Sequence, residues 1–361
     1  MDQKRYARQI ILPEIGVEGQ GKISSGKVLC IGVGGLGAAS TQYLAAAGVG
    51  RITLVDGDFV QLSNLQRQIL FSNADVERRK VEVAAQRLKA LNPDIEIVTH
   101  DKFLDLSLAE ELICQHDIVV DGTDNFTTKF LINDICVKYE IPFVYGAISG
   151  FDGEVATFWS KQGPCYRCFR PSPPKYFVAN CAQAGVIGAI AGLVGSAQAL
   201  EVIRYLVAGK ISQHPLAPEY GRLRMFGLSN SGEWQIKKNV DCTSCSKNAD
   251  LSAIAMDKYD RCVSYEVSVE EISDIKPDDF LVDVREVKEW QESHIPGAIN
   301  WPLSKFIENE LPDLSKVSSR IVFYCKSGAR SVQAAKIMNK NNKNSAVSLC
   351  GGIMEHYKPQ L

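Results

Sequence analysis

Hydrophobic positions in the first 150 residues fall into short apolar runs separated by longer segments with helical spacing. The apolar runs are typical of buried parallel strands and occupy residues 27–35, 51–58, 116–125 and 141–150, with an alternating stretch at 95–101. Between them, apolar residues recur at helical spacing in residues 36–50, 80–93 and 127–140. This alternation predicts an α/β domain with a Rossmann-like, mostly parallel sheet covered on both faces.

The pattern changes after Gly163, where a cysteine-bearing loop precedes a long apolar run at residues 184–197. That run is shorter than the ~20 residues needed to cross a bilayer and is followed by Gln198, Glu201 and Arg204, so we expect a buried helix. A polar stretch follows, and a second, smaller α/β unit begins near Cys262. We therefore predict a first domain at 1–246, a linker at 247–261 and a second domain at 262–361.

Composition narrows the functional classes. The 361 residues are 45% hydrophobic and carry a formal net charge of -2, so nothing global indicates a nucleic-acid or membrane partner. The first ten residues are charged and lack the apolar core of a signal peptide. The eleven cysteines include CxxC pairs, which suits metal and thiol chemistry in a reducing compartment and predicts a cytoplasmic protein.

The glycine-rich stretch GVGGLG at 32–37 follows the first predicted strand and opens a helix. Glycines there permit a tight turn, and backbone N–H groups can approach a phosphate at the helix N-terminus. Asp56 lies 21 residues beyond Gly35, at a strand end, where its carboxylate can bind ribose hydroxyls. These features fit a nicotinamide dehydrogenase as well as an enzyme that binds another nucleotide.

The following polar residues favour triphosphate chemistry. Arg67 and Lys80 lie just past the acidic strand end, where cations can hold phosphates and stabilise a leaving pyrophosphate. Asp124 and Asn125 follow another strand end at the same sheet edge, where a carboxylate can bind Mg²⁺. The alternative interpretation, that these are ordinary surface charges, weakens because they follow successive strands.

Several ordered motifs resemble the MoeB/ThiF adenylyltransferases, relatives of the ubiquitin-activating enzymes. They are RYARQIIL at 5–12, GVGGLG, DGDFVQLSNLQRQ at 56–68, Lys80 and DGTDN at 121–125. The resemblance implies that ATP and Mg²⁺ are used to adenylate the C-terminal glycine of a ubiquitin-like sulfur carrier of the MoaD/ThiS type, ending in Gly-Gly. The implied ATP-site residues are Gly35, Asp56, Asn64, Arg67, Lys80, Asp124 and Asn125. Arg8 matches an arginine that reaches the phosphates from the neighbouring subunit, which implies a homodimer.

Two CxxC pairs form a candidate metal centre. Their cysteines are Cys165, Cys168, Cys242 and Cys245, and four thiolates give the closed coordination of a structural zinc site. A redox couple would explain only one pair. The MoeB/ThiF family carries the same zinc site.

Cys181 stands apart from these pairs, before the long apolar run. A helix N-terminus there would lower the pKa of its thiol. The resemblance implies that it forms a thioester or an acyl disulfide with the activated carrier. The alternative is a buried cysteine without chemistry.

The C-terminal domain resembles a single rhodanese domain in residues 282–302 and in YCKSGARS at 324–331. Cys325 ends a predicted strand and opens a loop whose N–H groups, with Arg330, would stabilise a persulfide. The five steps from Cys325 to Arg330 suit sulfur, because related phosphatases have one residue more. Asp283 and Arg285 form either a structural ion pair or a catalytic one. Cys350 could approach the loop or merely pack in the core.

Together these features predict a two-step enzyme. The first domain would make an acyl-adenylate, and the Cys325 persulfide, charged by thiosulfate or a cysteine desulfurase, would attack it to give a thiocarboxylate. One alternative is an activating enzyme that passes its carrier on as a Cys181 thioester, with the rhodanese domain only a docking module. In the family this chemistry serves molybdenum cofactor or thiamine biosynthesis, cysteine synthesis and tRNA thiolation, and the sequence does not choose among them.

Overall fold

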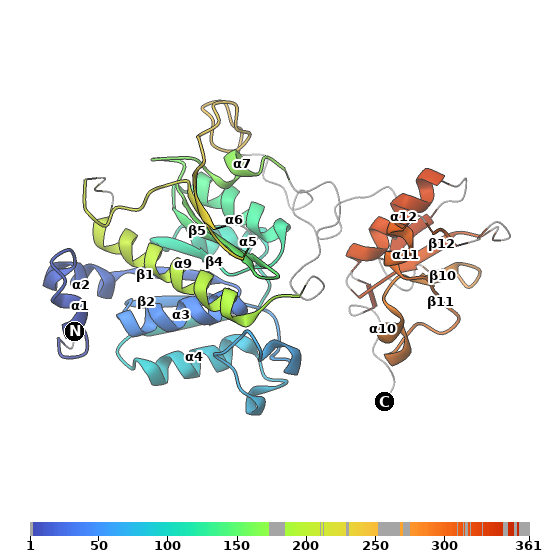
Figure 1. The fold of residues 1–361 in the computed structure, drawn as a ribbon, viewed down its shortest axis with the longest axis horizontal. Helices are drawn as coiled ribbons and strands as arrows, with labels where there is room; N and C mark the ends of the chain where they lie inside the picture. The colour runs from blue at the N-terminus through green and yellow to red at the C-terminus, as the bar shows by residue number, and fades with distance from the viewer. Residues whose placement is uncertain are drawn as a thin grey trace. The chain divides into compact units, whose positions relative to one another are not determined.

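The structure is a computed structural model of the chain. It describes residues 3–172, 185–209, 211, 213–228, 231–251, 268–269, 275–308, 310–312, 314, 317, 319–326, 328–341, 346–349 and 352–353. These residues fall into two compact units, one built from residues before 257 and the other from residues after it (Figure 1).

The described part of the first unit is built on one eight-stranded sheet in the order β3-β2-β1-β4-β5-β6-β7-β8. Five neighbouring strands are parallel: β1 (Lys27–Ile31), β2 (Arg51–Val55), β3 (Glu96–His100), β4 (Ile118–Asp121) and β5 (Phe143–Ser149). Three strands continue the sheet in antiparallel fashion: β6 (Asp152–Phe158), β7 (Arg222–Phe226) and β8 (Gly232–Gln235). The parallel strands all point their carboxyl ends to one edge, which is where the predicted nucleotide-binding residues follow them.

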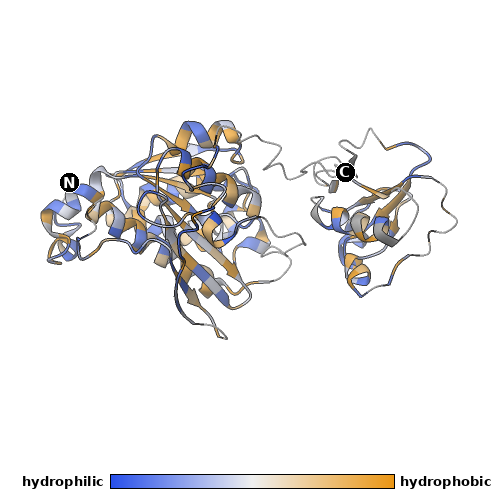
Figure 2. Cartoon of the chain, turned by 90° about the horizontal axis from the view of Figure 1, so that it is seen from above, coloured by the Kyte–Doolittle hydropathy of each residue, from blue (hydrophilic) through white to orange (hydrophobic). Residues whose placement is uncertain are grey.

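Helices cover both faces of this sheet (Figure 1). One face carries α3 (Gly35–Ala47), α4 (Lys80–Leu91) and α9 (Gly188–Ala208), and the other carries α5 (Leu106–Ile113) and α6 (Phe126–Lys138). Shorter elements are α1 (Ala7–Ile10), α2 (Gly16–Ser25), α7 (Tyr166–Phe169) and the 3₁₀ turns Leu62–Asn64 and Asn73–Asp75. Apolar residues line the strands and the helix faces against them, as Figure 2 shows by hydropathy.

The helix predicted from residues 184–197 is α9, and it is longer than the apolar run, since it extends to Ala208. Its 21 residues make it the one helix of the described chain that is long and apolar enough to cross a membrane by length and composition alone. It packs instead against α3, β5 and β6, and Gln198 and Glu201 are buried within it. This is the environment of a core helix, as the polar residues in its second half predicted.

The second unit is a five-stranded parallel sheet in the order β11-β10-β12-β13-β9, counted over its described residues. The strands are β9 (Ser268–Val269), β10 (Phe280–Asp283), β11 (Ile299–Asn300), β12 (Ile321–Tyr324) and β13 (Ala346–Leu349). The helices are α10 (Val287–Glu292), α11 (Leu303–Ile307) and α12 (Ala329–Asn341). The α11 and α12 helices pack together over a core that includes Val282, Phe323 and Ala335.

The predicted fold class is confirmed, but the first sheet also contains three strands that the sequence analysis did not predict. The strands β6, β7 and β8 run antiparallel, and their presence was not predicted, because the hydrophobic pattern loosens after Gly163. Residues 252–261 of the predicted linker lie outside the described residues.

Candidate active sites and metal centre

Glycines bring two loops of the first unit into backbone contact. Gly32, just past β1, has φ +85°, and a Cβ atom there would lie 2.8 Å from the carbonyl oxygen of Gly122, just past β4. A Cβ on Gly37 would lie 2.0 Å from the carbonyl oxygen of Gly32. A side chain on Gly32 would therefore separate the β1 and β4 loops, and one on Gly37 would separate the start of α3 from the β1 loop. Since α3 begins at Gly35, its N-terminal amides open onto this glycine loop.

Asp56 closes the β2 end of the loop. Its carboxylate accepts hydrogen bonds from the backbone N–H of Val33 (2.8 Å) and of Asp58 (2.9 Å). Burial raises the pKa of Asp56, while the positive charge of Lys80 and the two N–H groups act in the opposite direction. The carboxylate is thus fixed between the glycine loop and Lys80, as a ribose-binding acid requires.

Lys80 is the first residue of α4, and its side chain is only 7% exposed. Its Nζ lies 3.0 Å from Oδ2 of Asp58, whose side chain is 55% exposed. The lysine is therefore held at the sheet edge by an acid that solvent or a ligand can reach. A cation with a removable partner suits the binding of phosphates.

Asn64 ends the 3₁₀ turn after β2, and Arg67 lies in the turn that follows it. The Asn64 side-chain oxygen accepts the backbone N–H of Gln61 (3.2 Å), which fixes the turn. Arg67 donates to the carbonyl of Ser63 (3.0 Å), and its Cγ would lie 3.8 Å from a Cβ placed on Gly35. Arg67 therefore lies beside the N-terminus of α3.

Asp124 and Asn125 follow β4 at the same edge. The Asp124 side chain is exposed, and its carboxylate is the kind of oxygen ligand that Mg²⁺ prefers. Asn125 is the N-cap of α6, since its side chain accepts the N–H of Thr128 (2.8 Å). Because this bond uses one side-chain oxygen position, Asn125 has a structural role in addition to the predicted ligand role.

Arg8 lies elsewhere in the same chain. It is exposed on α1, which packs on the far end of α3, where the Gln9 side chain donates to the carbonyl of Ala47 (3.1 Å). The 13 residues of α3 span about 18 Å from Gly35 to that end. The chain therefore does not bring its own Arg8 to its own glycine loop.

Sequence reasoning missed a buried ion pair beneath the glycine loop. Lys129 of α6 contacts Asp121 at the end of β4 (2.7 Å), and both side chains are buried. Asp121 also accepts the backbone N–H and the hydroxyl of Thr123, while Gln198 of α9 donates to the backbone carbonyl of Asp121. A lysine directly before the apolar run 130–132 of the predicted helix was the available signal. The network fixes the loop that presents Asp124.

The four predicted zinc ligands come together. Their Sγ atoms all lie within 4.8 Å of one another, with contacts of 3.9 Å (Cys165–Cys168), 3.6 Å (Cys165–Cys242) and 3.4 Å (Cys168–Cys245). Tetrahedral coordination at the usual Zn–S length separates sulfurs by about 3.8 Å, so the cluster fits zinc.

Side chains of α6 fasten both cysteine loops. Asn133 accepts the backbone N–H of Tyr166 (2.7 Å), and Asp134 accepts bonds from Arg167 (2.7 Å) and from the hydroxyl of Ser244 (2.8 Å). These residues follow one cysteine of each CxxC pair. The same helix therefore begins at the predicted nucleotide edge and supports the metal centre.

Cys325 of the second unit lies directly after β12 and is only 1% exposed. The hydroxyl of Ser331 donates toward its sulfur (3.5 Å), and the N–H of Ile353 donates to its carbonyl (2.8 Å). Arg330 enters α12 just beyond and forms two bonds to Glu289 of α10 (2.6 and 2.7 Å). These bonds hold the pKa of Glu289 below its usual value.

Of the remaining predicted residues, Asp283 and Arg285 lie in the described part of the chain. Asp283 and Arg285 form a buried ion pair (2.7 Å), and Arg285 also donates to the carbonyl of Ser293, so the structural interpretation accounts for both side chains. Cys181 and Cys350 lie outside the described residues.

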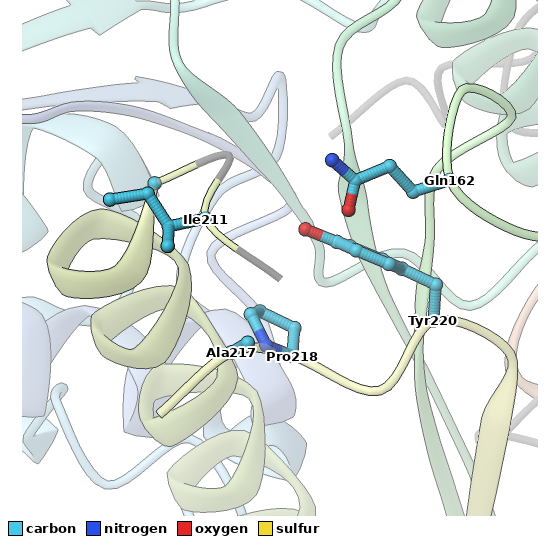
Figure 3. Close-up of a pocket in the computed structure, with 6 residues that line it drawn as sticks. Gln162, Ile211, Ala217, Pro218 and Tyr220 are labelled. Atoms are coloured by element: carbon cyan, nitrogen blue, oxygen red, sulfur yellow. The ribbon is translucent and has the colours of Figure 1, made fainter. Parts of the chain in front are cut away.

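A pocket of about 240 Å³ lies in the first unit at the carboxyl end of α9 (Figure 3). Its wall is neutral and is formed by Gln162, Gly209, Ile211, Ala217, Pro218 and Tyr220. The opposite end of α9 adjoins the nucleotide edge, since a Cβ on Gly188 would lie 2.2 Å from the carbonyl oxygen of Gln66. The pocket is therefore separate from the nucleotide edge of the first unit.

Comparisons with known proteins agree with this arrangement. Residues 6–244 match the family model described as the ThiF family, and residues 268–358 match the rhodanese-like domain. An adenylyltransferase and sulfurtransferase MOCS3 of Culex quinquefasciatus is 39% identical over 328 residues, which cover 84% of this chain and 73% of that protein. The probable adenylyltransferase/sulfurtransferase MoeZ of Mycobacterium tuberculosis is 37% identical over 366 residues, covering 97% of this chain and 91% of that protein.

Solved structures show the fold of the first unit. A crystal structure of E. coli MccB with ATP has a TM-score of 0.56 at 22% identity and covers 67% of this chain and 73% of that chain. A structure of MccB with AMPCPP and MccA has a TM-score of 0.59 at 21% identity, covering 68% and 75%. At this identity the likeness concerns the fold alone.

Proposed function

This chain belongs to the ThiF family and carries a C-terminal rhodanese-like domain, and from that premise we propose a two-step reaction on one carrier protein. The chain is an adenylyltransferase joined to a sulfurtransferase. Its first unit uses ATP to adenylate the C-terminal glycine of a ubiquitin-like sulfur carrier ending in Gly-Gly. Its second unit supplies the sulfur that converts this adenylate to a thiocarboxylate. The observation that carries the proposal is that one chain holds both the nucleotide-edge residues around Lys80 in its first unit and the Cys325 loop in its second.

In the first step a carboxylate oxygen of the carrier attacks the α-phosphorus of ATP. The bond from that phosphorus to the bridging oxygen breaks, and pyrophosphate leaves. Arg67, Lys80 and the N-terminal amides of α3 stabilise the negative charge that develops on the phosphates. Asp124 would hold Mg²⁺, which neutralises phosphate charge when bound.

In the second step the Cys325 thiolate takes the outer sulfur of thiosulfate, and sulfite leaves. The terminal sulfur of the persulfide then attacks the acyl carbon of the adenylate and expels AMP. The product is an acyl disulfide. A second thiolate, which we assign to Cys181, attacks the Cys325 sulfur, releases the thiocarboxylate and leaves a Cys181–Cys325 disulfide. A cellular thiol then reduces this disulfide, so we place the protein in the reducing cytoplasm.

A homodimer completes the first site in this proposal. Arg8 lies about 18 Å along α3 from its own glycine loop, so a second copy has to supply this cation. Exposed apolar side chains just after α1 and on α2, α3 and α9 offer an interface for that copy. They include Ile11, Val17, Tyr43, Leu193 and Leu200. The four cysteines would hold a structural zinc ion, which fixes the loops beside α6.

The test is the intact mass of a Gly-Gly carrier after incubation with the protein, Mg-ATP, thiosulfate and a reductant. We expect the thiocarboxylate mass. Lys80→Ala and Cys325→Ala are the matched variants: the first should lose pyrophosphate release and product, and the second should lose product alone. Undiminished thiocarboxylate from Cys325→Ala, with thiosulfate as the sole sulfur source, would overturn the proposal. A carrier thioester on Cys181 that forms without any need for Cys325 would favour protein conjugation instead.

A further inference from the structure

Two buried serine hydroxyls form a chain of hydrogen bonds that ends at the Cys325 sulfur. Ser348 is on β13 and Ser331 is in the first turn of α12, and neither side chain is exposed. The Ser348 hydroxyl donates to the Ser331 oxygen (2.8 Å). The Ser331 hydroxyl in turn lies 3.5 Å from the Cys325 sulfur and 2.9 Å from the carbonyl oxygen of Gly328. A chain of hydroxyls therefore runs from the neighbouring strand to the sulfur.

Each hydroxyl has one proton, and this sets the direction of the chain. When the Ser348 hydroxyl donates a hydrogen bond to Ser331, one of the two lone pairs of the Ser331 oxygen accepts it, and the Ser331 proton points away from Ser348. The Ser331 proton then has two acceptors, the Gly328 carbonyl and the Cys325 sulfur. An anionic sulfur attracts this proton more strongly than a neutral thiol does. Without the Ser348 donor, both lone pairs of the Ser331 oxygen are available, so this hydroxyl can donate to the Gly328 carbonyl and accept the S–H of Cys325, which favours the neutral thiol.

We propose that Ser348 is a positioning residue for sulfur transfer, which holds Ser331 as a hydrogen-bond donor to anionic sulfur on Cys325. The inference deepens the proposed function, on which its catalytic meaning rests. Ser348 itself touches no substrate. Its effect passes through Ser331 to the thiolate and to the persulfide, whose negative charge a hydroxyl donor stabilises.

The charged groups around Cys325 are separate from this hydroxyl chain. Arg330 on α12 is paired with Glu289 on α10, and Asp283 is paired with Arg285 at the end of β10. Lys326 follows Cys325 in the loop, and Tyr324 precedes it on β12. Replacing Ser348 changes none of these charges, so a pH effect of the replacement reports the hydroxyl chain.

The experiment measures alkylation of Cys325 by iodoacetamide as a function of pH, in the full chain, by mass spectrometry of the peptide that contains Cys325. Ser348→Ala should move the midpoint of the alkylation profile upward by about one pH unit. Ser331→Ala should move it at least as far. The double variant should show the Ser331→Ala midpoint with no further shift, because Ser348 acts through Ser331. Ser348→Thr keeps the hydroxyl and should restore the midpoint.

Activity supplies a second readout. Thiosulfate:cyanide sulfur transfer by Ser348→Ala should fall several-fold at pH 7 and return toward the wild-type rate at high pH, where the thiolate forms without help. A loss of packing alone would lower the rate equally at all pH values. An unchanged alkylation midpoint in a folded Ser348→Ala variant, or additive shifts in the double variant, would overturn the inference. Alkylation needs neither ATP nor carrier, so failure to form thiocarboxylate would count against the proposed function only.

Discussion

At the scale of single residues, the contact between Lys80 and Asp58 leads to a direct prediction. The Lys80 ammonium is nearly buried and has an exposed carboxylate beside it, so it keeps a partner until phosphates replace it. Lys80→Met removes a cation that faces the leaving pyrophosphate and should lower adenylation by about 100-fold or more. ATP–pyrophosphate exchange in the presence of the carrier measures this loss. Thiosulfate:cyanide sulfur transfer by the same variant is the control and should be unchanged.

A second residue-scale prediction concerns acid stability. His116 is buried, and its ring contacts the carbonyl of Leu112 (2.7 Å) and the hydroxyl of Thr53 (2.7 Å). Burial lowers the pKa of His116 in the folded chain. The pKa of this histidine in the unfolded chain is near 6.5, and above that pH the side chain is neutral in both states and adds no pH dependence to the free energy of unfolding. Below it the unfolded chain binds the proton more readily, so stability falls by up to about 1.4 kcal/mol per pH unit.

Calorimetry of the first unit's unfolding at pH 7.5 and pH 5.5 measures this dependence. His116→Asn should be less stable at pH 7.5 but should lose less on acidification than the wild type. An equal acid loss in wild type and His116→Asn would contradict the assignment.

Residues differ in how far sequence alone could place them. Asp56 and Asp124 were predictable because each comes just after a strand with a plain apolar pattern, and parallel strands end at one edge. The ion-pair partners were not predictable, because Asp58 with Lys80 and Glu289 with Arg330 meet across 22 and 41 residues of sequence. Pairing of that kind depends on tertiary packing, which no local period encodes.

At the scale of elements, the hydrophobic pattern predicted the parallel strands of the first sheet but not the antiparallel ones. Strands β1, β2 and β4 are buried on both faces and therefore read as continuous apolar runs. The strand β7 reads RLRMF, because Arg224 on it pairs with Glu201 and Glu233. Two arginines in five residues conceal a strand from any hydrophobic pattern. Charge pairs take the place of apolar contacts there.

The metal centre is an element-scale feature with its own prediction. Residues 242–245 are polar in sequence, and their cysteines lie against those of α7 and its N-cap. Ser244 joins the same segment to α6 through hydrogen bonds with Asn133 and Asp134. The purified protein should contain one zinc ion per chain. Cys242→Ser should lower the zinc content and the unfolding temperature of the first unit, since metal binding stabilises only the folded form. Elemental analysis and calorimetry measure both, and the unfolding of the second unit should not change.

At the scale of the whole molecule, the two units hold chemically separate residue sets. Lys80 and its neighbours belong to the first unit, and Cys325, Arg330 and Glu289 belong to the second. Each set is built from residues of its own unit, and in the proposed dimer the Arg8 of one copy serves the first site of the other. Variants in one set should therefore leave the isolated reaction of the other intact, and only thiocarboxylate formation should require both.

Arg8 provides the last prediction, which tests whether the first site is shared between two copies of the chain. Arg8→Ala and Lys80→Ala should each abolish adenylation when expressed alone. In a mixed dimer, one site would combine the intact Lys80 of one chain with the intact Arg8 of the other. Co-expression with free mixing should then restore about a quarter of the wild-type sites, because half of the dimers are mixed and each has one intact site. If Arg8 acted within its own chain, both sites of every mixed dimer would be defective, and pyrophosphate release would stay at the level of the single variants.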